Sequence, residues 1–145
     1  MHVTLWEYDV SLNEDVIDAP EETIRQRVRE YECGERTSFD LDVKFPNSFT
    51  GSVMREMHSI PYGETRTYGE IATKLDTSPV AVGQACGDNP IPLIVPCHRV
   101  VGANSMGGFS AGGERGQELK RALLTHEREG AEGGQSMLSS YTRER

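Results

Sequence analysis

The chain has 145 residues, of which 36% are hydrophobic, and these values predict one globular domain with room for a small appended subdomain. No apolar run approaches the ~20 residues that cross a bilayer, and the first ten residues lack the basic and long apolar stretches of a signal peptide. We therefore expect a cytoplasmic protein with no membrane partner. The formal net charge of −8 argues against nucleic acid as a partner, because phosphate neutralisation needs clustered Lys and Arg.

The first 45 residues predict a short N-terminal α/β subdomain. Residues 1–10 are rich in β-forming side chains, which predicts a strand. Residues 19–32 predict a helix, with Pro20 in its first turn and three side chains on one face: Ile24, Val28 and Tyr31. Apolar residues alternate without a break in residues 38–45, so we expect a half-buried strand there.

Residues 46–129 form the second predicted unit, which begins with helices. Apolar spacing predicts a helix over residues 49–60. The T-x-x-E pattern of Thr67 and Glu70 predicts a capped helix start, and Ser78 followed by Pro79 predicts the start of another helix that ends at Gly87. Two short helices joined by a short turn suit either a helix-turn-helix or an ordinary packed pair, and spacing alone favours the packed pair.

The C-terminal third carries an apolar run, a glycine-containing loop and one more helix. Residues 93–95 predict a buried strand that stops at Pro96. Residues 102–113 predict a loop, and residues 114–128 predict a helix with apolar residues on one side. Gly, Ser and charged residues dominate residues 130–145, which predicts a disordered tail. The expected fold class is α/β of the α+β kind, with a mainly helical second unit.

A thiol and an imidazole stand side by side where the apolar run ends, at Cys97 and His98. Burial raises the pKa of a thiol and makes it inert, but a nearby base can take its proton and activate the sulfur. Adjacent residues of a strand point to opposite faces, so the pair can act together only if the backbone turns at Pro96 and Cys97. On adjacency alone, a structural cysteine beside a surface histidine is the favoured alternative. The three cysteines form no C-x-x-C pair, which indicates free thiols in a reducing compartment.

Four separated stretches resemble the motifs of one family. They are NPIPLIVPCHRVVG (89–102), IPYGETRTYGEIA (60–72), GGFSAGG (107–113) and LLTHE (123–127). Together, over residues 46–128, they resemble the O6-alkylguanine-DNA alkyltransferases, also called methylated-DNA–protein-cysteine methyltransferases. The resemblance implies a helix-turn-helix and DNA repair by irreversible, single-turnover transfer of a methyl or alkyl group, without a cofactor.

The resemblance assigns chemistry to five residues. Cys97 matches the nucleophile that takes the alkyl group from O6 of guanine, and His98 matches the base that activates the thiol through a water. Glu127 matches the carboxylate that orients this histidine, and Asn89 matches the asparagine that braces the turn carrying the cysteine. Tyr68 matches a tyrosine near the flipped nucleotide that helps O6 leave as a carbonyl. Each also has a plain structural reading as a turn cap, a packed side chain or a solvated helix end.

The same resemblance implies the surfaces that hold the substrate. Ser110 matches a loop residue that hydrogen-bonds O6, and the backbone at Cys97 and Val100 would read the guanine edge. The implied pocket is lined by Pro92, Val100, Phe109 and Ser110. The implied DNA contacts lie on the second helix of the pair, at Val80, Ala81, Gly83 and Gln84. The implied partner is double-stranded DNA containing O6-alkylguanine, and the expected state is a monomer.

The sequence departs from the family pattern in several places. The family usually places an arginine in the recognition helix, but Val80 stands there, and residues 79–90 contain no Arg or Lys. Either an apolar wedge takes the place of the flipped base, or flipping is weak. Phe109 replaces a common tyrosine, and the N-terminal portion is shorter than usual. Some members hold zinc, but no metal is expected here, because no credible ligand set is offered by His2, Cys33 and His58.

The acidic composition is compatible with DNA binding if the protein works in concentrated salt. Acidic residues number 23 against 15 basic ones, of which only three are lysine. At 1 M salt the Debye length falls to about 3 Å, so that long-range repulsion from DNA is largely screened. We therefore expect a halophilic origin.

Two other functions fit parts of the sequence. A non-catalytic alkyltransferase-like protein would bind alkylated guanine and flag it; that branch lacks the nucleophile, so Cys97 argues against it, whereas Val80 leaves room for poor activity. An unrelated cysteine hydrolase that used Cys97 and His98 would need an oxyanion hole and would turn over.

Overall fold

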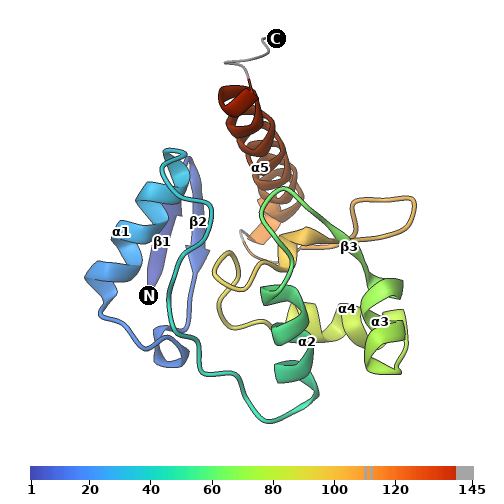
Figure 1. Cartoon of the computed structure of the whole chain (residues 1–145). Helices are drawn as coiled ribbons and strands as arrows, with labels where there is room; N and C mark the ends of the chain where they lie inside the picture. The colour runs from blue at the N-terminus through green and yellow to red at the C-terminus, as the bar shows by residue number, and fades with distance from the viewer. Residues whose placement is uncertain (110, 112, 140–145) are drawn as a thin grey trace.

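The computed structural model describes residues 1–109, 111 and 113–139, and begins with a β-hairpin (Figure 1). Strands β1 (His2–Leu5) and β2 (Tyr8–Ser11) pair antiparallel, with Leu5 opposite Tyr8. The single strand predicted for residues 1–10 is therefore split by a turn. Trp6 takes a positive φ of 56° at this turn, and its N–H donates to the Glu32 carboxylate.

Helix α1 (Glu21–Glu32) confirms the predicted N-terminal helix. Its buried residues are the predicted face, Ile24, Val28 and Tyr31, and the helix packs against β1. Pro20 was predicted in the first turn, but it stands at the N-cap position, one residue before the helix, and its side chain makes no capping hydrogen bond. A short 3₁₀ turn, η1 (Glu14–Val16), links the hairpin to α1.

The strand predicted over residues 38–45 is wrong. Only one antiparallel bridge forms, between Ile17 and Val43, and the Lys44 N–H donates to the Val16 carbonyl at 2.7 Å. Asp40 takes a positive φ of 53°, which breaks the extended backbone that a strand requires. The segment is irregular, and its alternating apolar side chains pack in or against the hydrophobic core.

Three helices form a cluster beyond this segment: α2 (Phe49–His58), α3 (Tyr68–Leu75) and α4 (Pro79–Gly87). The predicted capping box is present, because Thr67 accepts from the Glu70 N–H at 3.0 Å and Glu70 accepts from the Thr67 N–H at 2.7 Å. Ser78 caps α4 as predicted. Helices α3 and α4 pack on each other across residues 76–78, so the predicted two-helix unit with its short turn is confirmed.

The buried strand predicted at residues 93–95 is also wrong. These residues are buried, but Leu93 takes a positive φ of 82°, and the Val95 N–H donates back to the Ile91 carbonyl at 3.0 Å. The run is thus a buried turn that leads into a second 3₁₀ turn, η2 (Cys97–Arg99). Strand β4 (Val100–Val101) follows and pairs parallel with β3 (Arg66–Thr67).

Helix α5 (Gly116–Ser139) follows a 3₁₀ turn, η3 (Gly113–Arg115). It begins close to the predicted position but runs to Ser139, so residues 130–139 differ from the predicted disordered tail, and residues 140–145 lie outside the described residues. Within the described part of the chain, no helix has both the length and the apolar character that a membrane crossing needs.

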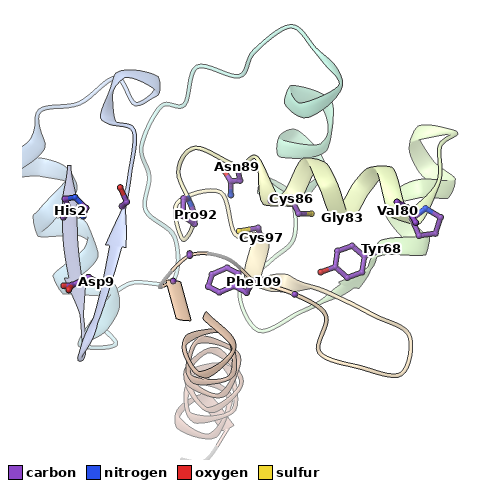
Figure 2. A pocket seen from close by; sticks show the side chains of 16 residues that line it. His2, Asp9, Tyr68, Val80, Gly83, Cys86, Asn89, Pro92, Cys97 and Phe109 are labelled. Carbon is purple, nitrogen blue, oxygen red and sulfur yellow. The ribbon is translucent and has the colours of Figure 1, made fainter. Parts of the chain in front are cut away.

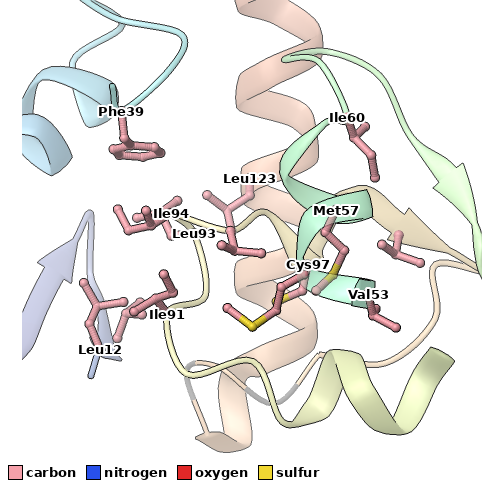
Figure 3. Close-up of a cluster of buried hydrophobic side chains, with 14 of the residues drawn as sticks. Leu12, Phe39, Val53, Met57, Ile60, Ile91, Leu93, Ile94, Cys97 and Leu123 are labelled. Carbon is pink, nitrogen blue, oxygen red and sulfur yellow. The ribbon is translucent and has the colours of Figure 1, made fainter. Parts of the chain in front are cut away.

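One hydrophobic core joins the N-terminal portion to the rest (Figure 3). Leu12 and Phe39 lie in the same cluster as Ile91 and Leu123, which come from the buried turn and from α5. The hairpin and α1 therefore share their core with the segment that carries Cys97.

Candidate active site

Cys97 lies at the wall of a cavity of about 830 Å³ (Figure 2). It is the first residue of η2, where Pro96 turns the chain and the Cys97 N–H donates to the Val95 carbonyl at 2.8 Å. The backbone therefore turns at Pro96–Cys97, which is the condition under which Cys97 and His98 can act together. The side chain is only 7% exposed, yet the cavity it lines falls within the range of small-molecule sites. The sulfur is sheltered but reachable.

Burial raises the pKa of the Cys97 thiol to about 11, although a hydrogen bond with Asn89 and the charge of Lys120 act in the opposite direction. The sulfur is therefore protonated at neutral pH. A thiol in this state attacks an electrophile only if a neighbouring group accepts its proton.

His98 is fully buried next to this thiol in sequence, and its ring is held by Glu127. His98 Nε2 lies 2.7 Å from Glu127 Oε2. Because a carboxylate accepts, Nε2 carries the ring hydrogen, and Nδ1 keeps a free lone pair. This Nδ1 is buried, and no described residue gives it a hydrogen-bond partner. Burial lowers the pKa of His98, which favours the neutral form that a base requires.

Glu127 is the centre of a buried polar network. Arg99 binds it with two donors, Nε to Oε1 at 2.7 Å and Nη2 to Oε2 at 2.9 Å. The Tyr31 hydroxyl donates to Oε2 at 2.6 Å. Burial by itself raises the pKa of Glu127, but His98 and Arg99 outweigh it and hold this pKa well below its usual range. Glu127 is thus a carboxylate that fixes the histidine ring.

Two members of this network, Arg99 and Tyr31, were not predicted as site residues. Arg99 also donates from Nη1 to the Ile60 carbonyl at 2.7 Å, so the guanidinium ties η2 to the end of α2. The sequence could have indicated a role for Arg99, because it follows the Cys-His pair directly, and an arginine next to a buried apolar run needs an anionic partner. For Tyr31 the sequence indicated only that its side chain lies on the buried face of a helix, and not that it contacts Glu127.

Asn89 braces the turn that carries Cys97. Its side-chain amide donates to the Val95 carbonyl at 2.8 Å, and its Oδ1 accepts from the Ile91 N–H at 3.1 Å. Both bonds satisfy backbone groups of the buried turn, which has no strand partner for them. The structure therefore places Asn89 where the resemblance put it.

Tyr68, the first residue of α3, borders the cavity. The loop passes so close to its ring that a Cβ on Gly107 would lie 2.7 Å from the Tyr68 hydroxyl oxygen. Gly107 also has a φ of 79°, so this position needs glycine on both counts. Burial raises the pKa of Tyr68, so the hydroxyl keeps its proton and can donate it in a hydrogen bond.

Lys120 is a further residue that sequence reasoning missed. It is fully buried on α5, and its Nζ donates to the Val100 carbonyl at 2.6 Å and to the Gly108 carbonyl at 3.0 Å. Burial lowers its pKa to about 8. The backbone at Val100 was predicted to read the guanine edge, but its carbonyl is bound by Lys120, and Val100 is fully buried and does not line the cavity.

The remaining predicted residues divide between the cavity and its surroundings. Pro92, Phe109, Val80 and Gly83 line the cavity, and Val80 is 70% exposed. Ala81 and Gln84 lie on the same helix, but they do not line the cavity. Ser110 lies outside the described residues. Among the residues that are described, no group of three or more His, Cys, Asp and Glu side chains is arranged to hold a metal ion.

Comparison with known proteins gives the family. Residues 48–129, more than half of the chain, match the family described as 6-O-methylguanine DNA methyltransferase, DNA binding domain. The chain belongs to this family. The matched residues contain the whole Cys97–His98–Glu127 arrangement, whereas Tyr31 comes from the part before the match.

Relatives in this methyltransferase family support the assignment. A methylated-DNA–protein-cysteine methyltransferase of Methanocaldococcus vulcanius is 58% identical over 77 residues, 53% of this chain and 46% of that protein. One of Archaeoglobus fulgidus is 44% identical over 102 residues, 68% of this chain and 69% of that protein. The chain thus spans from about half to about two thirds of these relatives' lengths.

The fold is also that of the methyltransferase family. A Mycobacterium tuberculosis OGT crystallised in complex with DNA has a TM-score of 0.68 and 41% sequence identity, and the likeness covers 75% of this chain and 68% of that one. The mixed α/β class predicted from the sequence is thereby confirmed.

Proposed function

We propose that this protein repairs duplex DNA by transferring a methyl or larger alkyl group from O6 of guanine to Cys97. The observation that carries the proposal is the sheltered sulfur at a cavity wall, next to a histidine that Glu127 holds with Nδ1 free. In the reaction the Cys97 Sγ–carbon bond forms as the O6–carbon bond breaks. The Cys97 proton goes to His98 Nδ1, directly or through a water. The guanine leaves with its C6 carbonyl restored and takes up one proton at N1 from solvent, and His98 later returns its proton to solvent, so that the protons balance.

The transfer needs no cofactor and stops after one event. The product is a thioether, and no group in the proposed site can cleave it, so each chain acts once. Tyr68 donates a hydrogen bond that helps O6 leave as a carbonyl. Pro92 and Phe109, which line the cavity, would contact the base, and Ser110 is proposed to hydrogen-bond O6.

DNA binding falls to α4 in this proposal, with contacts at Val80, Ala81, Gly83 and Gln84. The alkylated base must leave the stack to reach the cavity, at a cost of a few kcal/mol. Val80 is suited to fill the vacated space, because its apolar side chain is 70% exposed at the cavity rim. The site is complete within one chain, so we propose that a monomer acts, with residues 46–129 as the DNA-binding and catalytic unit.

The composition suggests the conditions in which this reaction takes place. Three free cysteines suit a reducing compartment such as the cytoplasm. The net charge of −8 suits concentrated salt, in which repulsion between the protein and DNA is screened.

A single-turnover assay tests the proposal. Protein is titrated into a duplex that holds one O6-methylguanine, and restored guanine is measured by mass spectrometry of the digested DNA. We expect one lesion repaired per chain and none by Cys97→Ala, which should still bind the duplex. A wild-type protein that binds the lesion but restores no guanine would instead have the flagging function, which the absence of basic residues on α4 favours.

A further inference from the structure

Tyr31 reaches the proposed catalytic network from outside the segment that the family match covers. It belongs to α1, whereas the match begins at residue 48. Its side chain is fully buried, and its hydroxyl donates to Glu127 Oε2 at 2.6 Å. The N-terminal portion thus supplies a hydrogen bond to the carboxylate that holds His98.

Helix α5 and neighbouring rings hold Tyr31 in one position. His126 Nε2 lies 2.9 Å from the Tyr31 carbonyl oxygen, so adjacent residues of α5 contact both ends of this tyrosine. The Tyr31 ring packs at 5.0 Å from the rings of Phe39 and His126. The hydroxyl therefore cannot turn away from Glu127 without disturbing the core.

The position of the hydroxyl matters because one oxygen serves three donors. Glu127 Oε2 accepts from His98 Nε2, from Arg99 Nη2 and from Tyr31. Each added donor draws negative charge away from the bond to His98 and makes an extra proton on the imidazole less stable. The other titratable or charged groups that face this network are Arg99 in η2, Tyr62 before β3, Lys120 and His126 in α5, and His58 in α2.

We infer that Tyr31 is a positioning residue, whose hydroxyl holds Glu127 so that His98 stays neutral and its Nδ1 stays open for the Cys97 proton. This inference rests on the proposed alkyl transfer. It makes the N-terminal portion part of the chemistry, since that portion sets the proton affinity of a base that lies in another part of the chain.

The test is the pH dependence of the single-turnover rate in Tyr31→Phe, which removes one oxygen and keeps the ring. We expect the acid limb of the profile to move up by about one pH unit, as the loss of one charge-assisted bond would cause. The rate should fall most at low pH and approach that of the wild type at high pH. A uniform loss of rate at every pH, or no change, would overturn the inference, because a merely structural residue would produce either.

Two further variants sharpen this test. Tyr62→Phe is the matched control, because Tyr62 packs in the same aromatic cluster, 6.2 Å from the Tyr31 ring. We expect its acid limb to stay in place. Replacing Tyr31 by 3-fluorotyrosine gives a more acidic phenol and a stronger donor, so its acid limb should move down. A shift of the same sign in both Tyr31 variants would contradict the inference, and this variant also serves if Tyr31→Phe does not fold.

The outcome is separable from that of the proposed function. Wild-type protein that accepts no methyl group would refute alkyl transfer, whatever Tyr31 does. In that case the titration of the His98 ring, followed by NMR, still reports on Tyr31, because His98 should bind its proton at higher pH in Tyr31→Phe than in the wild type. Equal titration in both proteins would refute the role of Tyr31 alone.

Discussion

The two sides of Cys97 are built in opposite ways. Behind the sulfur, His98, Arg99, Glu127 and Tyr31 form a buried network in which both oxygens of the carboxylate are occupied. In front of it lies an open cavity, with the exposed side chain of Val80 at its rim. Under the proposed function this difference separates two tasks, because setting the proton affinity of His98 needs fixed groups in a dry interior, whereas receiving a flipped base needs open space.

The buried side should respond most strongly to mutation. Glu127→Gln leaves the Arg99 charge without its counter-charge in the interior, so we expect the free energy of unfolding to fall by about 3–5 kcal/mol. Urea denaturation at pH 7 measures this loss. The control is Glu129→Gln on the exposed side of the same helix, which should change the free energy by less than about 0.5 kcal/mol. Equal effects of the two changes would mean that the network contributes nothing special to stability.

Acid should weaken the same side. The pKa values of Glu127 and His98 are both lowered in the folded state, so as the pH falls the unfolded chain binds protons at a higher pH than the native state does. The contribution of His98 is lost as the pH falls below about 6.5, and that of Glu127 as the pH falls below about 4.5. We expect the free energy of unfolding to decrease by about 1.4 kcal/mol per pH unit for each such proton. Constant stability between pH 7 and pH 4 would contradict these pKa directions.

The brace between the two sides should have a smaller effect. Asn89→Ala leaves the buried Ile91 N–H without its partner, whereas the Val95 carbonyl keeps only the bond from the Cys97 N–H. We expect a loss of about 1–3 kcal/mol in the free energy of unfolding. The rate of alkyl transfer should fall as well, because the turn that aims Cys97 loosens. The exposed Asn47→Ala change is the control for both measurements. Transfer at the wild-type rate in Asn89→Ala would show that the turn holds its shape without this side chain.

The open side should respond in DNA binding and not in stability. Val80→Arg adds a positive charge at the cavity rim, so we expect tighter duplex binding at low salt and a log–log salt slope steeper by about one. The matched control, Gln26→Arg, adds the same charge to the exposed surface of α1. Fluorescence anisotropy between low and high salt compares them. If Val80→Arg and Gln26→Arg change affinity alike, Val80 does not face the duplex.

The acidic residues of the surface should have the smallest effect on stability, counted for each residue. An exposed ion pair contributes only about 0–1 kcal/mol to stability. The chain has 23 acidic residues and 15 basic ones, so the excess negative charges repel one another at low salt. We expect the free energy of unfolding to be larger in molar salt than in dilute buffer, while the buried network is unaffected by screening. Greater stability at low salt would refute the proposed adaptation to concentrated salt.

Local signals in the sequence predicted the helices and part of the site. Two helix starts are examples, at Thr67 with Glu70 and at Ser78 with Pro79. Each cap is made by residues that lie within a few positions of one another, so the local sequence is enough to predict it. The two strand predictions were wrong because a strand needs a partner strand from a distant part of the chain. Residues 38–45 form only one bridge, and at Leu93 the chain turns with a positive φ. A buried apolar run does not by itself distinguish a strand from a turn.

The same distinction holds within the site. Motif resemblance gave Cys97, His98 and Glu127, but not Tyr31, whose partner is distant in the chain. Nor did it show that Lys120 is buried against the Val100 carbonyl. Such contacts depend on how α1 and α5 pack in the folded protein, and residue spacing in the sequence does not predict that packing.

The most direct measurement locates the alkyl group on the protein. Cys86 lines the same cavity as Cys97, but burial raises its pKa to about 12, and its neighbours in the chain are Ala85 and Gly87, whereas Cys97 is followed by His98. After incubation with a duplex containing O6-methylguanine, peptide mapping should find one methyl group on Cys97 and none on Cys86 or Cys33. Restored guanine together with a methyl group on Cys86, or with Cys97 unmodified, would contradict the account.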